Sequence, residues 1–290
     1  MTLGVADNPY ARNAPTAVRA AAEELGVPVR VIDLPSLALH LATAGAATAT
    51  DRHGAVRVDS LAPYLLFGYP AATHAFRVVT RTAFCQNPVD AVLTADDKAA
   101  TAQRLALAGV PQVPTHVCAL DRDQLRGAAA GIGYPVVVKR THGAQGRWVR
   151  RAHDDATLDG AYDELAAEGP GALVVQPLVG PAEGTSVRAV VTGGRIIGAA
   201  QRTADAGEWR SNIAGGASQV PVTLTDAERD AVLGAVRALG LGHAGVDLLR
   251  SGPDSFVLEV NSCPDFTSML PYFAEDLRRA VVTASLCPPA

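Results

Sequence analysis

The most informative part of the chain reads AGVDLLR at residues 244–250, SGPDS at residues 251–255 and FVLEVNSCP at residues 256–264. Two apolar runs that contain Val, Leu and Phe flank a Gly-Pro-Asp sequence. Runs of this composition, separated by turn residues, are typical of two antiparallel strands. The stretch therefore predicts a β-hairpin with a polar connection.

A turn centred on Pro253 places Asp247 opposite Glu259 and Gly245 opposite Asn261. Side chains alternate between the two faces of a strand, so Glu259 and Asn261 share one face. Because direct cross-strand partners lie about 5 Å apart between Cβ atoms, three oxygen-bearing side chains are expected to converge on one spot.

Two opposed carboxylates in apolar strands repel each other unless a cation lies between them. Mg²⁺ typically takes one or two carboxylates together with phosphate oxygens and water. The bare Gly245 leaves room for a ligand to approach the backbone. The hairpin thus indicates a magnesium site made by Asp247, Glu259 and Asn261. A hairpin with its charges on a solvated face is the alternative from this stretch alone.

The composition is that of a globular protein. Of 290 residues, 48% are hydrophobic and 19% are charged, and the length suggests two or three lobes. The net charge of -4 argues against a nucleic-acid binder, which would carry a clustered basic surface. The N-terminus lacks the features of a secretory signal, and no apolar run reaches the roughly 18 residues needed to span a bilayer. We expect neither a nucleic acid nor a membrane as a partner.

The four cysteines, Cys85, Cys118, Cys263 and Cys287, are widely spaced and form no CxxC pair. Such usage favours reduced thiols in the cytoplasm over a zinc site or a disulfide scaffold. Cys263 follows the predicted metal site closely, but no histidine stands near it in the sequence. Inert packing is therefore preferred to a role as a nucleophile.

Residues 1–94 alternate strand-like and helix-like segments, as expected for an α/β layer. Strands are predicted over residues 3–5, 29–32 and 63–67, and an Ala-rich helix over residues 14–25.

The segment 94–109 predicts a helix that Thr94 caps and that Gly109 ends. Lys98 falls in its first turn, where the helix dipole disfavours a cation. An anion elsewhere would hold the lysine there, and a solvated lysine is the simpler alternative.

Lys139 ends the apolar strand predicted over residues 134–140, so its stem is expected to be buried with the ammonium group at one end. Gly143 and Gly146 follow in a polar loop. Backbone N–H groups of a glycine loop and the point charge of a lysine together suit a polyphosphate. For the GxxG sequence by itself, a plain hairpin turn is the alternative.

The C-terminal half continues with a predicted hairpin over residues 185–202, a polar loop over residues 203–219 and a helix over residues 225–239. A long polar loop inside a compact domain is usually functional or disordered. The helix leads into the hairpin that carries the predicted metal site.

Taken in order, Lys98, Lys139 with its glycine loop, VVQPL at residues 174–178, GEWRSNIAGG at residues 207–216 and the hairpin 244–264 resemble the ATP-grasp ligases. In particular the chain is similar to the RimK-type branch, which includes the ribosomal-protein glutamate ligase and the LysX-type amino-acid ligases.

The resemblance runs from about residue 87 to residue 269, with a vaguer likeness over the remainder. It implies an α+β fold of three parts: an α/β N-terminal pre-ATP-grasp domain at residues 1–94, a helix and lid subdomain at residues 95–177, and an ATP-grasp core with the metal site at residues 178–290.

The resemblance also implies three sets of site residues. The set expected to bind ATP is Lys98, Lys139, Gly143, Gly146, Gln176, Pro177, Leu178, Val179, Glu183, Ser186 and Ser211. The set expected around the phosphates and the acyl-phosphate reaction is Arg188, Arg202, Arg210 and Asn212. The ligands of Mg²⁺ (or Mn²⁺) are Asp247, Glu259 and Asn261, in agreement with the hairpin argument.

The chain departs from the family pattern at three places. Pro177 stands where the family hinge usually has an acidic residue, and proline has no N–H to donate. Ser186 replaces a family aspartate, so ribose contact is weakened or has moved to Glu183. Asp265 replaces the glycine of a proline-glycine pair and could select an amine or another cationic group.

The implied activity is ATP-dependent joining of a carboxylate to an amine through an acyl phosphate. Positioning and electrostatics carry such a step without a protein nucleophile. The resemblance implies a small amino acid or peptide as substrate, possible ring closure within one molecule, and a homo-oligomer. The alternatives are a kinase on the same fold and a nucleotide-binding protein with degenerate catalysis.

Overall fold

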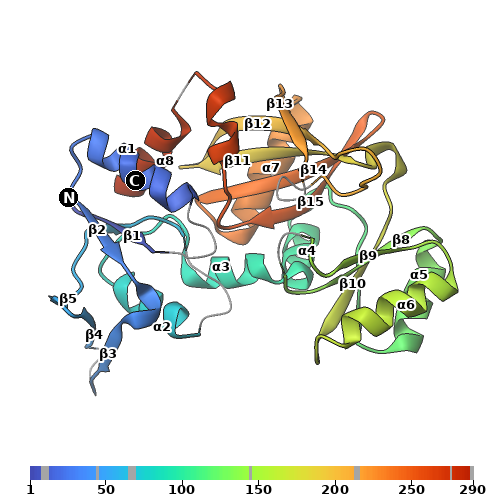
Figure 1. Cartoon of the computed structure of the whole chain (residues 1–290), viewed down its shortest axis with the longest axis horizontal. Helices are drawn as coiled ribbons and strands as arrows, with labels where there is room; N and C mark the ends of the chain where they lie inside the picture. The colour runs from blue at the N-terminus through green and yellow to red at the C-terminus, as the bar shows by residue number, and fades with distance from the viewer. Residues whose placement is uncertain are drawn as a thin grey trace.

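The computed structural model describes residues 1–7, 13–43, 46–64, 70–143, 146–211, 216–274 and 276–287. Figure 1 shows three regions in a row: the N-terminal segment on the left, an antiparallel sheet in the centre, and a smaller sheet with helices α5 (Arg122–Ile132) and α6 (Asp155–Ala166) on the right. No helix among the described residues is both long and apolar enough to cross a bilayer.

The N-terminal region contains a parallel sheet, a helix that packs on it, and a small antiparallel sheet. Its elements are β1 (Leu3–Ala6), α1 (Asn13–Glu24), β2 (Val29–Ile32), η1 (Leu34–Ser36), β3 (Ala38–Leu41), β4 (Ala47–Asp51), β5 (Gly54–Ala55), β6 (Ser60–Leu61) and α2 (Pro70–Val79). The parallel sheet has the order β2-β1-β6, and the second sheet has the order β3-β4-β5.

Most of the expected N-terminal elements are confirmed. The strands expected at residues 3–5 and 29–32 and the helix expected at residues 14–25 are present as β1, β2 and α1. The strand expected over residues 63–67 is wrong where the structure describes it: the pairing with β1 is made by Ser60 and Leu61, while residues 65–67 lie outside the described residues. The N–H of Ala62 still donates to the carbonyl of Gly4, but Pro63 and Tyr64 do not continue the pairing.

The right-hand region has its own hydrophobic cluster, formed by described residues between Cys118 and Val175. Its sheet is antiparallel, and both helices cover one side of it (Figure 1). The elements are β7 (His116–Ala119), α5 (Arg122–Ile132), β8 (Val136–Arg140), β9 (Val149–Ala152), α6 (Asp155–Ala166) and β10 (Ala172–Pro177), and the strand order is β7-β10-β8-β9.

The central region is a five-stranded antiparallel sheet of order β13-β12-β11-β14-β15 among the described residues. Helices pack on it, and α8 also packs on α1 of the N-terminal region. The elements are α3 (Val89–Asp96), α4 (Lys98–Leu107), η3 (Gly180–Ala182), β11 (Thr185–Thr192), β12 (Arg195–Thr203), β13 (Ser218–Pro221), α7 (Asp226–Leu239), β14 (His243–Ser251), β15 (Asp254–Asn261), η5 (Thr267–Tyr272) and α8 (Leu277–Leu286).

The helix expected over residues 94–109 begins later than predicted. Asp97 is its N-cap, and the Asp97 carboxylate accepts hydrogen bonds from the N–H groups of Ala99 (2.8 Å) and Ala100 (3.3 Å). Thr94 instead belongs to α3, where its hydroxyl donates to the carbonyl of Asp90. Asp97 can take the role that was predicted for Thr94, because a carboxylate satisfies the open N–H groups of a helix as well as a hydroxyl does.

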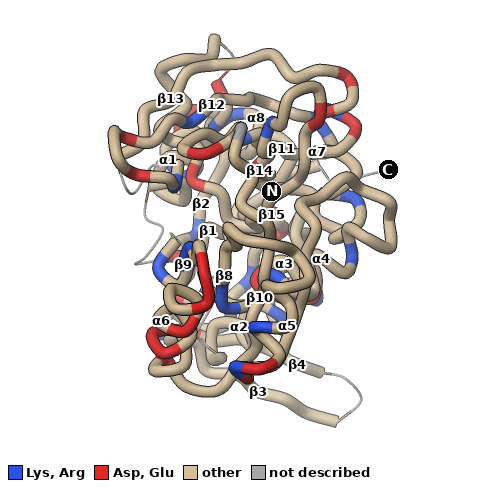
Figure 2. The backbone as a smooth tube through the Cα atoms, turned by 90° about the vertical axis from the view of Figure 1, so that its right-hand side faces the viewer, with Lys and Arg blue, Asp and Glu red and all other residues tan. Residues whose placement is uncertain are grey.

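Charges of both signs are interspersed along the backbone (Figure 2). The acidic residues of α6 pair with the basic residues of α5, as in the contacts of Asp159 with Arg122 (3.1 Å) and Arg126 (2.5 Å). The expectation that no nucleic acid is a partner stays a prediction.

Candidate active site

The hairpin of β14 and β15 has the predicted register at the site. Asp247 pairs with Glu259, and Gly245 pairs with Asn261. The turn itself is tighter than expected, because Ser251 pairs with Asp254. A β-bulge next to Asp247 restores the register, and since one extra residue shifts every later pair, the bulge decides which side chains meet.

A buried ion pair occupies the face of the hairpin. Arg188, on the neighbouring strand β11, pairs with Asp247 in register and donates to its two carboxylate oxygens from Nε (2.5 Å) and Nη2 (2.6 Å). Burial by itself would raise the pKa of Asp247, but the charge and hydrogen bonds of Arg188 outweigh it and the pKa is lowered. Asp247 is therefore an anion in the folded protein.

The space that Gly245 was expected to leave for a ligand is filled. A Cβ atom on Gly245 would lie 2.8 Å from Nη1 of Arg188 and 2.8 Å from Cβ of Pro264. The glycine thus makes room for the guanidinium group that binds Asp247, rather than for a ligand at the backbone.

The cluster holds more buried cations than carboxylates. Lys139, Arg188 and Arg202 are each less than 9% exposed, and they act electrostatically on Asp247 and Glu259. Burial lowers the pKa of Lys139 to about 8, and burial followed by the charge of Arg188 lowers that of Arg202 to about 10. Burial and neighbouring cations thus disfavour the charges of Lys139 and Arg202, whereas Asp247 raises the pKa of Arg188 against the effect of burial. The two disfavoured cations make the site suited to an anion.

Arg202 shows the excess of buried positive charge most clearly. Its Nη1 lies 3.8 Å from the nearer oxygen of Asp247, and its buried Nε has no hydrogen-bond partner among the described residues. A buried donor without a partner is costly unless a bound group satisfies it. Phosphate or carboxylate oxygens fit this donor in both charge and hydrogen-bonding chemistry.

Lys139 of β8 is buried, as its apolar run predicted, and its side chain reaches the adjacent strand β10. Its Nζ donates to the side-chain oxygen of Gln176 at 2.8 Å, and the Gln176 amide nitrogen donates to the hydroxyl of Thr115 at 2.8 Å. The N–H of Leu178 donates to the carbonyl of Pro135. The side chain of Gln176 therefore positions the lysine. This role of Gln176 was not apparent from the sequence, because β8 and β10 come together only in the sheet.

Lys98 and the glycine loop are in direct contact. Nζ of Lys98 donates to the carbonyl of Gly143 at 2.6 Å, and its backbone N–H donates to the carbonyl of Thr141. Gly143 has a φ of +135°, and a Cβ atom there would lie 2.4 Å from the ring of Trp148. Glycine is thus required at this position by conformation and by space.

The loop after β12 contacts both the glycine loop and β11. Nη1 of Arg210 donates to the carbonyl of Gly146 at 3.2 Å, and Glu208 binds the same guanidinium group. The hydroxyl of Ser211 donates to that of Ser186 at 2.7 Å. Asn212, expected near the phosphates, lies outside the described residues.

Other expected residues are placed nearby with defined partners. Glu183, considered for ribose contact, forms an ion pair with Arg151 of β9. Asp265 accepts from the N–H and hydroxyl of Thr267 and from the side-chain amide of Asn13. Pro177 ends β10, and Val179 precedes η3.

The oxygen atoms of the hairpin fit a hard divalent cation. Nδ2 of Asn261 donates to Oε1 of Glu259 at 3.1 Å, so the two side chains lie together beside Asp247. Carboxylate and amide oxygens are the ligand types that Mg²⁺ prefers. A negative phosphate chain next to them would balance Lys139, Arg188 and Arg202.

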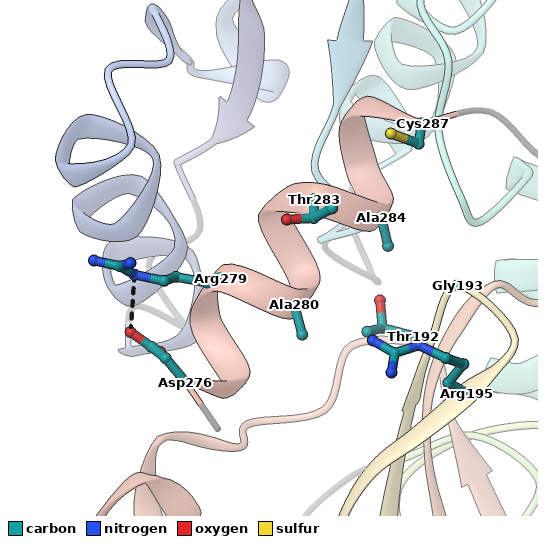
Figure 3. Close-up of a pocket in the computed structure, with 9 residues that line it drawn as sticks. All are labelled: Thr192, Gly193, Arg195, Asp276, Arg279, Ala280, Thr283, Ala284 and Cys287. Carbon is teal, nitrogen blue, oxygen red and sulfur yellow. Dashed lines mark ion pairs between the residues drawn. The ribbon is translucent and has the colours of Figure 1, made fainter. Parts of the chain in front are cut away.

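A cavity of about 430 Å³ lies elsewhere, between the β11–β12 turn and α8. Thr192 and Arg195 line one side of it, and α8 lines the other (Figure 3). In the figure, Arg279 points away from the opening toward Asp276. None of the expected site residues that the structure describes lines this cavity.

Residues 95–284 match the family model of the RimK-like ATP-grasp domain. The chain belongs to the RimK-like ATP-grasp family. It is 36% identical over 203 residues to a probable alpha-L-glutamate ligase of Xanthomonas oryzae pv. oryzae, a match that covers 69% of this chain and 67% of the relative.

Two solved ATP-grasp structures share the fold over almost the whole length. D-cycloserine synthetase DcsG superposes with a TM-score of 0.73 at 20% identity, over 98% of both chains. The ATP-grasp ligase PsnB, complexed with a phosphomimetic variant of its minimal precursor, Mg and ADP, gives a TM-score of 0.73 at 18% identity, over 98% of this chain and 97% of that one.

These matches confirm the expected α+β ATP-grasp fold and the RimK-type ATP-dependent ligase class. ATP and a divalent metal are the cofactors of this family.

Proposed function

We propose that this chain joins a carboxylate to an amine, with ATP as the source of energy and an acyl phosphate as the intermediate. The observation that carries the proposal is the buried excess of positive charge around Asp247 and Glu259. A kinase would use the same positive charges. The two activities are therefore distinguished by the products that form when an amine is present.

The residues act through position and charge. Lys98 and Lys139 would contact the phosphates, with Gly143 and Gly146 in the loop above them. Gln176, Pro177, Leu178 and Val179 would receive adenine through backbone groups. Glu183 would contact the ribose, and Ser186 and Ser211 would complete the nucleotide-binding set. The cationic and polar set assigned to the transferring phosphoryl group is Arg188, Arg202, Arg210 and Asn212.

Asp247, Glu259 and Asn261 would hold Mg²⁺ (or Mn²⁺), which when bound neutralises negative charge on the phosphate oxygens. A substrate carboxylate oxygen attacks the γ-phosphorus, and the bond from that phosphorus to the ADP oxygen breaks. The amine then attacks the acyl carbon, phosphate leaves, and one proton is released from the nitrogen. Arg188 and Arg202 stabilise the charge that develops at the first step.

The substrates we propose are a small amino acid or a peptide. The sequence relative is named as a probable alpha-L-glutamate ligase. The structural relatives are named as a D-cycloserine synthetase and as a ligase that has been complexed with a precursor peptide. Closure of a ring within one molecule uses the same chemistry. Asp265, 18 residues after Asp247 and within electrostatic reach of Arg202, is a candidate to attract the amine.

We further propose that the chain is divided into an N-terminal pre-ATP-grasp domain at residues 1–94, a helix and lid subdomain at residues 95–177, and an ATP-grasp core at residues 178–290. The hydrophobic cluster confined to residues between 118 and 175 supports a separate lid. The described cysteines form no disulfide bond with one another, which supports a cytoplasmic location. A homo-oligomer is proposed from the family resemblance alone.

The test is ADP and phosphate release from ATP and Mg²⁺ with amino acids and short peptides, singly and in pairs, with mass spectrometry of the products. A product lighter by one water than the sum of its two components supports the ligase. A single component that gains a phosphoryl group would instead establish a kinase.

The variant Glu259→Gln should lower turnover steeply, by about 100-fold or more, because a metal ligand loses its charge. Asp254→Asn is the matched control, since it removes an exposed carboxylate from the turn of the same hairpin. Equal activity of both variants would contradict the assignment of the metal site.

A further inference from the structure

Asn87 is a buried residue that the reaction scheme does not use. It lies in the segment before α3, and its side chain is fully buried. Nδ2 donates to the carbonyls of His243 (2.8 Å) and Ser262 (2.9 Å), and Oδ1 accepts from the N–H groups of Gly242 (3.0 Å) and His243 (2.9 Å). A side-chain amide has two donors and two acceptor sites, so every position is used.

These four bonds join the two strands of the metal-site hairpin at its open end. Gly245 and Asn261 form the outermost pair between the strands. Beyond that pair, β14 extends back to His243, whereas Ser262 is the first residue after β15. The turn closes one end of the hairpin, and Asn87 bridges the other.

We propose that Asn87 is a positioning residue for the metal-binding set, an inference that rests on the function proposed above. Strand ends open readily when nothing holds them. Asn261 is covalently next to Ser262, and its Nδ2 donates to Glu259. A shift of Ser262 therefore moves two of the three ligands away from Asp247.

Only an amide of this length provides both kinds of bond. Alanine removes all four bonds and leaves buried backbone groups unpaired. Serine offers one hydroxyl on a shorter stem, which cannot reach both strands. Replacement of the Asn87 amide should therefore change the geometry of the hairpin as well as lower the stability of the fold.

Gln86 provides a matched control because it is adjacent and also buried. Its Oε1 accepts from the hydroxyl of Thr192 (3.1 Å) and the N–H of Gly193 (2.9 Å), and its Nε2 donates to the hydroxyl of Ser285 (3.1 Å). These side-chain bonds go to the β11–β12 turn and to α8. Gln86→Ala should destabilise the fold without moving the metal ligands.

The experiment measures ADP binding by isothermal titration calorimetry, with and without Mn²⁺, to the full-length wild type and to Asn87→Ala and Gln86→Ala. Circular dichroism sets a temperature at which all three are folded. Positioning groups around metal ligands typically change metal affinity by about 10- to 100-fold. We expect Asn87→Ala to weaken the Mn²⁺-dependent part of ADP binding to that extent and to leave metal-free ADP binding unchanged.

Gln86→Ala should keep the wild-type dependence on Mn²⁺. If Asn87→Ala is not folded, Asn87→Ser is measured in its place with the same expectation. Wild-type metal dependence in a folded Asn87 variant would overturn the inference. Absence of any Mn²⁺ effect on ADP binding by the wild type would instead overturn the proposed function, and the inference with it.

Discussion

Replacing Lys139 by methionine is expected to stabilise the folded protein at neutral pH while removing its ATP-dependent activity. The lysine is 8% exposed, and burial lowers its pKa from 10.5 to about 8. Each pKa unit corresponds to about 1.4 kcal/mol. Keeping the charged lysine in the folded state therefore costs about 3 kcal/mol at neutral pH, where the ammonium group is protonated in both the folded and unfolded chains.

Methionine avoids this cost but loses the hydrogen bond to Gln176 (2.8 Å). An unpaired amide oxygen in this position costs about 1 to 2 kcal/mol. The expected net gain of Lys139→Met is thus about 1 to 2 kcal/mol in the free energy of unfolding at pH 7. Activity should fall because no cation remains at this position beside the phosphates.

The gain should depend on pH with a definite sign. Between pH 8 and pH 10.5 the unfolded wild-type chain binds a proton that the folded chain has lost, so wild-type stability rises with pH across this window. Below pH 8 the cost of the buried charge is complete, and above pH 10.5 it is absent. The advantage of the methionine variant should therefore shrink as the pH rises from 8 to 10.5.

Urea unfolding of both proteins at pH 7, 8.5 and 10 measures the difference. Lys139→Arg is the control, because arginine keeps its charge throughout and should show no such gain. A methionine variant that is less stable than wild type at pH 7, by an amount independent of pH, would refute the account of the buried lysine.

Three further perturbations follow from the contacts. Arg188→Met should destabilise the protein by about 3 to 5 kcal/mol, because Asp247 is left buried without its partner; urea unfolding measures this. Asp97→Ala should cost about 1 kcal/mol through loss of the cap of α4, measured by thermal unfolding. Gly143→Ala should lower ATP-dependent activity about tenfold or more, because the new methyl group would overlap the ring of Trp148; steady-state kinetics measures this.

Each of the three substitutions has a control variant that should have a smaller effect. A double change of Arg188 and Asp247 to apolar residues should recover part of the lost stability, and Asp97→Asn should retain most of the cap. Gly127→Ala, where a Cβ atom meets nothing within 4 Å, should leave activity intact. Normal kinetics of Gly143→Ala would show that the loop conformation is not needed.

The local sequence was sufficient wherever a short-range pattern fixes the structure. The hairpin over residues 244–264 could be read from its turn and its alternation, and the pairing of Asp247 with Glu259 followed from them. The burial of Lys139 followed from its place at the end of an apolar run. Even here, the register depended on a β-bulge that could not be predicted from the residue types. The bulge compensates for a turn that is one residue tighter than expected.

The partners of the site residues were decided only by the tertiary structure. Arg188 meets Asp247 because β11 lies beside β14, Gln176 meets Lys139 because β10 lies beside β8, and Asn87 reaches a hairpin more than 150 residues away. Hydrogen bonds of this kind depend on distances of about 3 Å between groups that the chain order keeps apart. The sequence by itself therefore determined the chemistry that the site can hold. The packing of the sheets decided which side chain meets which, because only the folded sheets bring these groups within bonding distance.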